Sequence, residues 1–209
     1  MPLRHASGLA NASHWASVRA GQEREESVAE PRNRYSTVSL VLHWLIAALV
    51  LGQIVLITAA EAEGPNRAMW MMLHKSGGMT ILALTLFRIG WRVANPAIAL
   101  PSAMPRWEKI FARMTHVLFY VVLLALPLTG WLAGSAMGRH FLYYGLFQFP
   151  LLPVGGGRDT ASALMAVHTA LPKLLYVLLA LHVLGALKHQ FVNRDNVLHR
   201  MIPIIPRRP

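Results

Sequence analysis

The sequence predicts an all-α integral membrane protein, built as a four-helix bundle with both termini in the cytoplasm. Of its 209 residues, 55% are hydrophobic and only 14% are charged, whereas an ordinary soluble domain carries about 25% charged residues. The apolar residues gather in four segments long enough to cross a bilayer, and the basic residues gather at the edges of these segments. No internal repeat and no β-hairpin signal competes with this pattern.

The first two helices are expected at about 38–60 and 73–93. No charged residue occurs from Tyr35 to Ala60, and a helix needs only about 20 apolar residues to cross the hydrocarbon core. The Glu-Ala-Glu-Gly-Pro turn at 61–65 ends this helix, because proline cannot continue it. The second segment carries Lys75 near its start and Arg88 and Arg92 near its end. Their charged ends must therefore extend to the membrane surface.

The third and fourth helices are expected at about 115–136 and 163–190. The third contains Pro127 and Gly130, which predict a kink. The fourth is interrupted early by Pro172 and carries Lys173 well inside the apolar run. The connection between them, about 137–162, is rich in aromatic residues that suit a segment lying on the outer membrane surface. The three glycines at 155–157 read as a linker there.

Basic residues in short loops set the orientation of membrane helices, because they are retained in the cytoplasm. They concentrate before the first helix, between the second and third, and after the fourth: Arg32, Arg34, Arg88, Arg92, Arg106, Lys109, Arg113, Lys188, Arg194, Arg200, Arg207 and Arg208. The other two connections hold few basic residues and also carry acidic ones. Both termini are therefore expected in the cytoplasm.

The ends of the chain differ from this domain at 35–203. Residues 1–34 are polar and lack a sustained apolar period, which predicts a disordered tail with no cleavable signal peptide. Residues 204–209 form a basic tail. The net charge of +11 does not indicate nucleic-acid binding, because the basic residues flank apolar runs rather than line one polar face. There is no cysteine, which excludes covalent c-type haem, iron–sulfur clusters and disulfides.

Four histidines lie in or beside the apolar segments: His43, His74, His168 and His182. His168 and His182 are 14 residues apart, which places them within about 40° on one helix face and about 21 Å apart along it. A polar group without a partner in hydrocarbon is costly, and coordination of iron would satisfy one ring nitrogen. Depth along the helices pairs His43 with His182 and His74 with His168. The pattern predicts two non-covalent haems b, each with two axial histidines.

Four other residues extend this hypothesis. His116 opens the third helix at the level of His43 and competes with it as a ligand, although an interfacial histidine is the simpler interpretation. His189 and Lys188, at the cytoplasmic end of the fourth helix, are candidates for a quinone and proton site, or for a solvated helix end. Lys173 lies on the outer side and either attracts an anion or extends to the membrane surface.

The order and spacing of several motifs resemble the bacterial di-haem cytochrome b561 family over about residues 34–203. These motifs are Arg34-Tyr35-Ser36, Leu42-His43-Trp44, the stretch from Leu73 to Gly78, Phe87-Arg88 with Trp91-Arg92, Thr115 to Tyr120, Leu126 to Gly130, His168, His182, Lys188-His189 and Asp195 to Met201. Each motif is weak alone, and the set is fairly specific. The long N-terminal segment and Pro172-Lys173 depart from the family pattern.

The resemblance implies a four-helix bundle with two haems b, held at His43, His74, His168 and His182. It further implies electron transfer between a quinone pool and a second partner; one branch of the family oxidises superoxide and reduces ubiquinone. The expected partners are therefore lipid, a quinone, and a donor on the outer side, either superoxide or a periplasmic redox protein. Whether the chain is itself an enzyme, such as a superoxide:quinone oxidoreductase, is left open.

Two other functions are compatible with the sequence. The chain could be the haem b anchor subunit of a periplasmic dehydrogenase or hydrogenase, with the chemistry on another polypeptide, because such anchors share the histidine pattern. It could also be a transporter or structural membrane protein that binds no haem. A large co-purifying subunit would favour the first alternative, and the absence of visible absorption would favour the second.

Overall fold

The computed structural model describes residues 35–62, 64–96, 104–195, 198–199 and 201–202. The chain divides at residue 34 into two units, Met1–Arg34 and Tyr35–Pro209. The first unit and residues 203–209 lie outside the described residues, and with them the expectations for both tails. The description below concerns the second unit.

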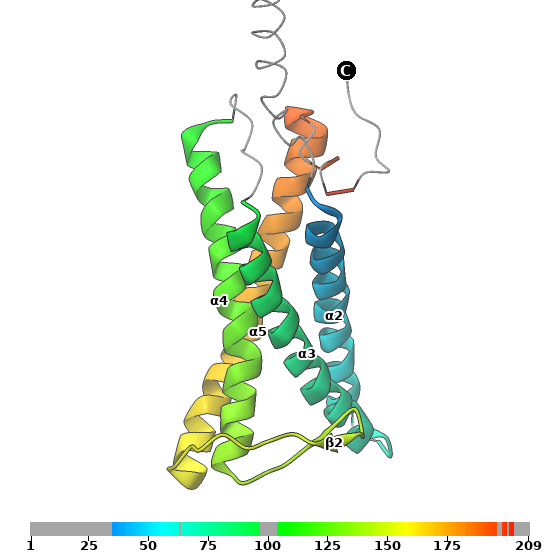
Figure 1. Cartoon of the computed structure of the whole chain (residues 1–209), viewed down its shortest axis with the longest axis vertical. Helices are drawn as coiled ribbons and strands as arrows, with labels where there is room; N and C mark the ends of the chain where they lie inside the picture. The colour runs from blue at the N-terminus through cyan, green and yellow to red at the C-terminus, as the bar shows by residue number, and fades with distance from the viewer. Residues whose placement is uncertain (1–34, 63, 97–103, 196–197, 200, 203–209) are drawn as a thin grey trace, which may run out of the picture. The chain divides into compact units, whose positions relative to one another are not determined.

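The second unit is a bundle of four long helices, drawn as coiled ribbons in Figure 1. They are α2 (Thr37–Glu61), α3 (Arg67–Ala94), α4 (Arg106–Ala136) and α5 (Gly157–Lys188), and α5 continues into a short π-helix, η1 (His189–Asn193). α2 packs on α3, α3 on α4 and α4 on α5. We call the end of the bundle that contains the start of α2 and the end of α5 the tail end, and the opposite end the hairpin end.

Three of the helices begin earlier than the sequence predicted. α3 starts at Arg67 rather than at 73, α4 at Arg106 rather than at 115, and α5 at Gly157 rather than at 163. The absence of charge marks the part of a helix that can lie in hydrocarbon, whereas helical hydrogen bonding continues into the polar region beyond it. Arg106, Lys109 and Arg113 are therefore helical residues rather than loop residues.

Three helices of the described chain are long and apolar enough to span a membrane: Thr37–Glu61, Arg106–Ala136 and Gly157–Asn193. α3 has 28 residues but is not among them, although the sequence predicted four spans. Its Lys75 is followed by Ser76, Gly77 and Gly78, which lower its hydropathy. α3 completes the bundle by packing on α2 and α4.

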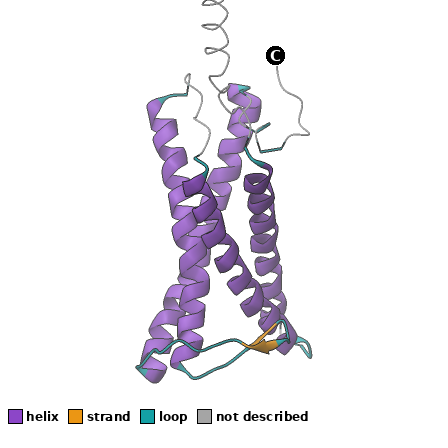
Figure 2. Ribbon diagram, in the orientation of Figure 1, coloured by secondary structure: helices purple, strands orange, loops and turns teal. Residues whose placement is uncertain are grey.

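The connection between α4 and α5 contains a small β-hairpin, although the sequence carries no hairpin signal there. β1 (Leu142–Tyr143) pairs antiparallel with β2 (Phe147–Gln148), shown in orange in Figure 2. Strands of two residues are too short to show an alternating pattern. The turn between them places Tyr144 and Gly145 at positive φ, 49° and 77°. Tyr144 is held there by its backbone N–H, which donates to Ser76 Oγ at 2.9 Å.

The same connection is fixed to α4 by side chains. Trp131 Nε1 donates to the Pro150 carbonyl at 2.8 Å, and the backbone N–H of Leu152 donates to Ser135 Oγ at 3.1 Å. Two of the three glycines at 155–157, expected to form a linker, belong to the start of α5. Gly156 caps this helix in the left-handed conformation, and Gly157 is its first residue.

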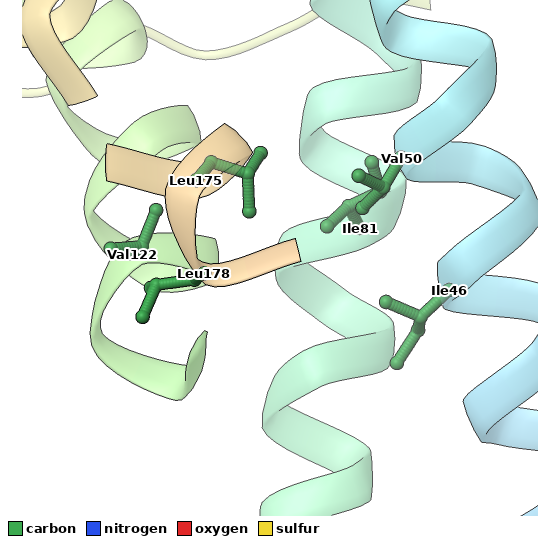
Figure 3. Close-up of a cluster of buried hydrophobic side chains, with 6 residues drawn as sticks. All are labelled: Ile46, Val50, Ile81, Val122, Leu175 and Leu178. Atoms are coloured by element: carbon green, nitrogen blue, oxygen red, sulfur yellow. The ribbon is translucent and has the colours of Figure 1, made fainter. Parts of the chain in front are cut away.

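The hydrophobic core lies halfway along the bundle and draws on all four helices. Its buried residues are Ile46 and Val50 of α2, Ile81 of α3, Val122 of α4, and Leu175 and Leu178 of α5. Figure 3 shows the residues of α2 and α3 facing those of α4 and α5. Leu175 and Leu178 lie between His168 and His182 in sequence, so the core separates the levels of these two histidines.

Candidate functional site

The structure brings the four histidines together as two pairs at two levels. At the tail end, His43 of α2 faces His182 of α5, with their ring centres 6.2 Å apart. At the hairpin end, His74 of α3 faces His168 of α5, with ring centres 6.3 Å apart. These are the partners that depth in the sequence predicted. α5 supplies one histidine to each pair, and α2 and α3 supply the others.

These separations fit two imidazoles on opposite sides of one iron. A metal–imidazole bond of about 2.0 Å and a distance of about 1.1 Å from ring nitrogen to ring centre put two such rings about 6.2 Å apart. The described residues contain no group of three or more His, Asp, Glu or Cys that could hold a metal ion. Two histidines at each level would suit a haem, which needs few ligands from the protein.

At the hairpin end, the ring of His168 is fixed by the helix that it packs against. Its Nδ1 donates to the Leu126 carbonyl at 2.9 Å and lies 3.4 Å from Thr129 Oγ1. A hydrogen bond on one ring nitrogen sets the tautomer and leaves the other nitrogen available for a metal. Gly130 permits this approach, because a Cβ at that position would lie 3.0 Å from His168 Cε1.

Buried polar atoms without a partner lie beside the histidine pairs. In the described part of the chain these are Gln53 Oε1, His74 Nδ1 and Thr85 Oγ1. Gln53 packs on Gly77, one helical turn from His74, and the Gln53 amide occupies the space that a Cβ at Gly77 would need. A buried, unpaired polar atom costs about 1–3 kcal/mol. Such atoms are therefore expected where a bound group or a reoriented side chain completes the site.

His116 lies close to the tail-end pair but in a different arrangement. Its ring centre is 5.3 Å from that of His182, shorter than the about 6.2 Å that two opposed ligands of one iron require. Its Nδ1 lies 2.6 Å from the Ala112 carbonyl of its own helix. On distance, His43 is the better partner for His182.

The tail end also carries two contacts between polar side chains that sequence reasoning did not find. Lys188 Nζ lies 2.6 Å from Glu108 Oε1 and 5.7 Å from the centre of the Trp107 ring. His189 Nδ1 lies 2.7 Å from Asp195 Oδ2. The first contact depends on the approach of α4 to α5, and the second on the π-helical turn, in which the Asp195 N–H donates to the His189 carbonyl. Neither residue type nor spacing in the sequence signals that approach.

Lys173 lies apart from the hairpin-end pair. It follows His168 by five residues, which turns it by about 140° around the helix, and its side chain is exposed on the surface of α5. Lys75 is exposed at the same end and lies 5.9 Å from the centre of the Phe141 ring.

Comparison with known proteins decides the family. Residues 34–203 match the model of the family described as prokaryotic cytochrome b561. The chain belongs to this family. It is 33% identical to cytochrome b561 homolog 2 of Escherichia coli K12 over 180 residues, which cover 81% of this chain and 91% of that protein. It is 31% identical over 179 residues to the probable superoxide oxidase CybB of Yersinia pestis, covering 81% and 96%.

A third relative is cytochrome b562 of Cereibacter sphaeroides, with 28% identity over 178 residues that cover 80% of this chain and 94% of that protein. Membership confirms the sequence-based assignment to cytochrome b561. The protein is accordingly a haem-related electron-transfer protein of the bacterial inner membrane.

Proposed function

We propose that this cytochrome b561 carries two haems b and moves electrons across the membrane to a quinone. The observation that supports the proposal most directly is the pair of histidine–histidine separations, 6.2 and 6.3 Å. His43 and His182 would hold the tail-end haem, and His74 and His168 the hairpin-end haem. A bound haem would supply a one-electron centre, and a pair of histidines holding it would leave no position free for oxygen.

The protein's own residues determine how these two centres would work together. α5 sets their separation, since His168 and His182 are about 21 Å apart along the helix. The buried aliphatic core around Leu175, Leu178 and Ile81 keeps water and protons out of the space between them. Electrons could then cross the membrane without protons.

For the quinone we propose the tail end, which basic residues assign to the cytoplasm. Reduction of a quinone takes two electrons and two protons. His189 is partly buried, and its Nδ1 contacts Asp195 Oδ2. Its other ring nitrogen, Nε2, would then remain available to exchange a proton with the quinone. Lys188 is held by Glu108 and would contribute charge rather than protons.

For the electron donor we propose the opposite, hairpin end. A relative bears the name probable superoxide oxidase, and superoxide is one donor compatible with this end. Two superoxide ions would each lose one electron to form oxygen, and one quinone with two protons would become one quinol. Lys75 and Lys173 are exposed cations at this end that would attract such an anion. A periplasmic redox protein is the other donor considered.

Quantitative haem analysis tests the proposal. We expect pyridine haemochrome assays of the pure protein to give two haems b per chain, both extractable with acid acetone because the chain has no cysteine. A ratio near zero would favour a membrane protein without haem. Co-purification of a large catalytic subunit would favour an anchor subunit instead.

The quinone assignment has its own test. We expect His189→Ala to retain both haems and to slow their oxidation by a water-soluble ubiquinone analogue about 10²- to 10⁴-fold, the usual contribution of a positioned proton donor. Stopped-flow spectroscopy of the reduced protein measures this rate. His140→Ala, in the connection at the hairpin end, is the matched control. An unchanged rate in His189→Ala would assign His189 to a solvated helix end and direct the search to the hairpin end.

A further inference from the structure

Thr85 stands out among the buried residues that the proposed mechanism does not use. Its side chain in α3 is fully buried, with 0% exposure, and its Oγ1 is one of the buried polar atoms of the described chain that have no hydrogen-bond partner. The other two, Gln53 Oε1 and His74 Nδ1, lie beside the hairpin-end pair. Thr85 lies toward the tail end.

The orientation of this hydroxyl differs from that of other threonines in the helices. Five of them donate to the carbonyl four residues earlier, at 2.7–3.0 Å; these are Thr58, Thr80, Thr115, Thr129 and Thr169. Threonine in a helix has two accessible rotamers, and one of them makes this bond. No such bond joins Thr85 to Ile81. The Thr85 hydroxyl is therefore not engaged by its own helix.

The packing of α2 against α3 sets the level of Thr85. Trp91 Nε1 donates to Ser36 Oγ at 3.2 Å, and Arg88 Nη1 donates to the Ser39 carbonyl at 2.8 Å. The two helices are antiparallel, so each step forward in α2 matches an equal step back in α3. His43, four residues after Ser39, accordingly lies at the level of residues 84 and 85 along the bundle.

His43 needs a partner of the kind that Thr85 offers. Among the described residues neither ring nitrogen of His43 forms a hydrogen bond, and the His43 ring lies near the rings of Trp44 and His182. A histidine that binds metal through one nitrogen almost always donates from the other. His168, at the hairpin end, does so to the Leu126 carbonyl. His43 has no corresponding hydrogen bond to a described residue.

We propose that Thr85 is a positioning residue for the tail-end haem: its Oγ1 accepts a hydrogen bond from the His43 ring nitrogen that faces away from the iron. The inference rests on the proposed di-haem function. An acceptor on that nitrogen makes the imidazole a stronger donor to the metal, which favours ferric over ferrous iron. Loss of the acceptor should therefore raise the reduction potential of the tail-end haem and leave the other haem unchanged.

Three variants of the full-length protein test this role by redox titration and by electron paramagnetic resonance of the oxidised form. In Thr85→Val we expect both haems to remain, with the reduction equilibrium of one haem shifted two- to tenfold toward ferrous iron; tenfold corresponds to about 59 mV for one electron. Thr85→Ser keeps the hydroxyl and should match the wild type. Thr115→Val is the matched control, because Thr115 is buried on α4 and its hydroxyl is bonded to Phe111.

The results separate this inference from the proposed function. A wild-type protein without two haems would overturn the function itself. With two haems present, equal potentials for Thr85→Val and the wild type would overturn the role of Thr85, as would equal shifts in Thr85→Ser and Thr85→Val. If Val lowers the haem content, Thr85→Ala removes the hydroxyl with a smaller side chain, and its potential must then differ from that of Thr85→Ser.

Discussion

His168→Ala and His182→Ala are each expected to leave a protein with one haem, and each should lose a different one. α5 provides one histidine at each level, and the ring of each faces a histidine on another helix at 6.2 or 6.3 Å. Alanine removes one of the two axial ligands, so the haem content should fall from two per chain to about one. Pyridine haemochrome analysis gives the ratio, and low-temperature difference spectra identify the haem that remains.

Alanine substitutions of the facing histidines on α2 and α3 should cause the same two losses of haem. His43→Ala should give the same spectrum as His182→Ala, and His74→Ala the same as His168→Ala. His116→Ala is the informative control, because its ring lies 5.3 Å from that of His182, and it should retain both haems. If His116→Ala removes the tail-end haem while His43→Ala does not, the ligand pair at that end is His116 with His182.

The arrangement of the histidines could be predicted because it depends on helical geometry alone. His168 and His182 share a face of one helix at a spacing that 3.6 residues per turn determines. The direction of each helix then assigns His43 and His74 to their levels. The levels of these four histidines could therefore be predicted without knowing the conformation of the loops or the packing of the side chains.

Other features depend on packing between distant segments and could not be predicted in this way. The hairpin at Leu142–Gln148 is held by contacts of Tyr143 and Tyr144 with Thr80 Oγ1, at 3.0 Å each, which join residues more than 60 positions apart. Lys188 and Glu108 meet across 80 positions. The rotamer of Thr85 likewise has no signal in the sequence, because threonine accepts both orientations in a helix.

Gly130→Val is expected to remove the hairpin-end haem while the tail-end haem remains. A Cβ at Gly130 would lie 3.0 Å from His168 Cε1 and 3.1 Å from Nδ1, and valine adds two further carbons. The ring cannot move away easily, because its Nδ1 is bonded to Leu126, one turn earlier on the helix that carries Gly130. Loss of the contacts that support a metal ligand weakens metal binding by about 10- to 100-fold. Because valine would clash with the His168 ring itself, we expect the loss of haem affinity to be at the upper end of that range.

Gly52→Val provides the control for this substitution, since a Cβ at Gly52 in α2 would meet nothing within 4 Å. Both variants add the same side chain to a long apolar helix, so a difference between them isolates the contact with His168. Gly130→Ala should fall between them, because its single methyl meets the ring without the two further carbons. Haem content and the spectrum of the remaining haem are the measurements. Two haems and an unchanged spectrum in Gly130→Val would mean that His168 can leave its present position and still bind, or that it is not a ligand.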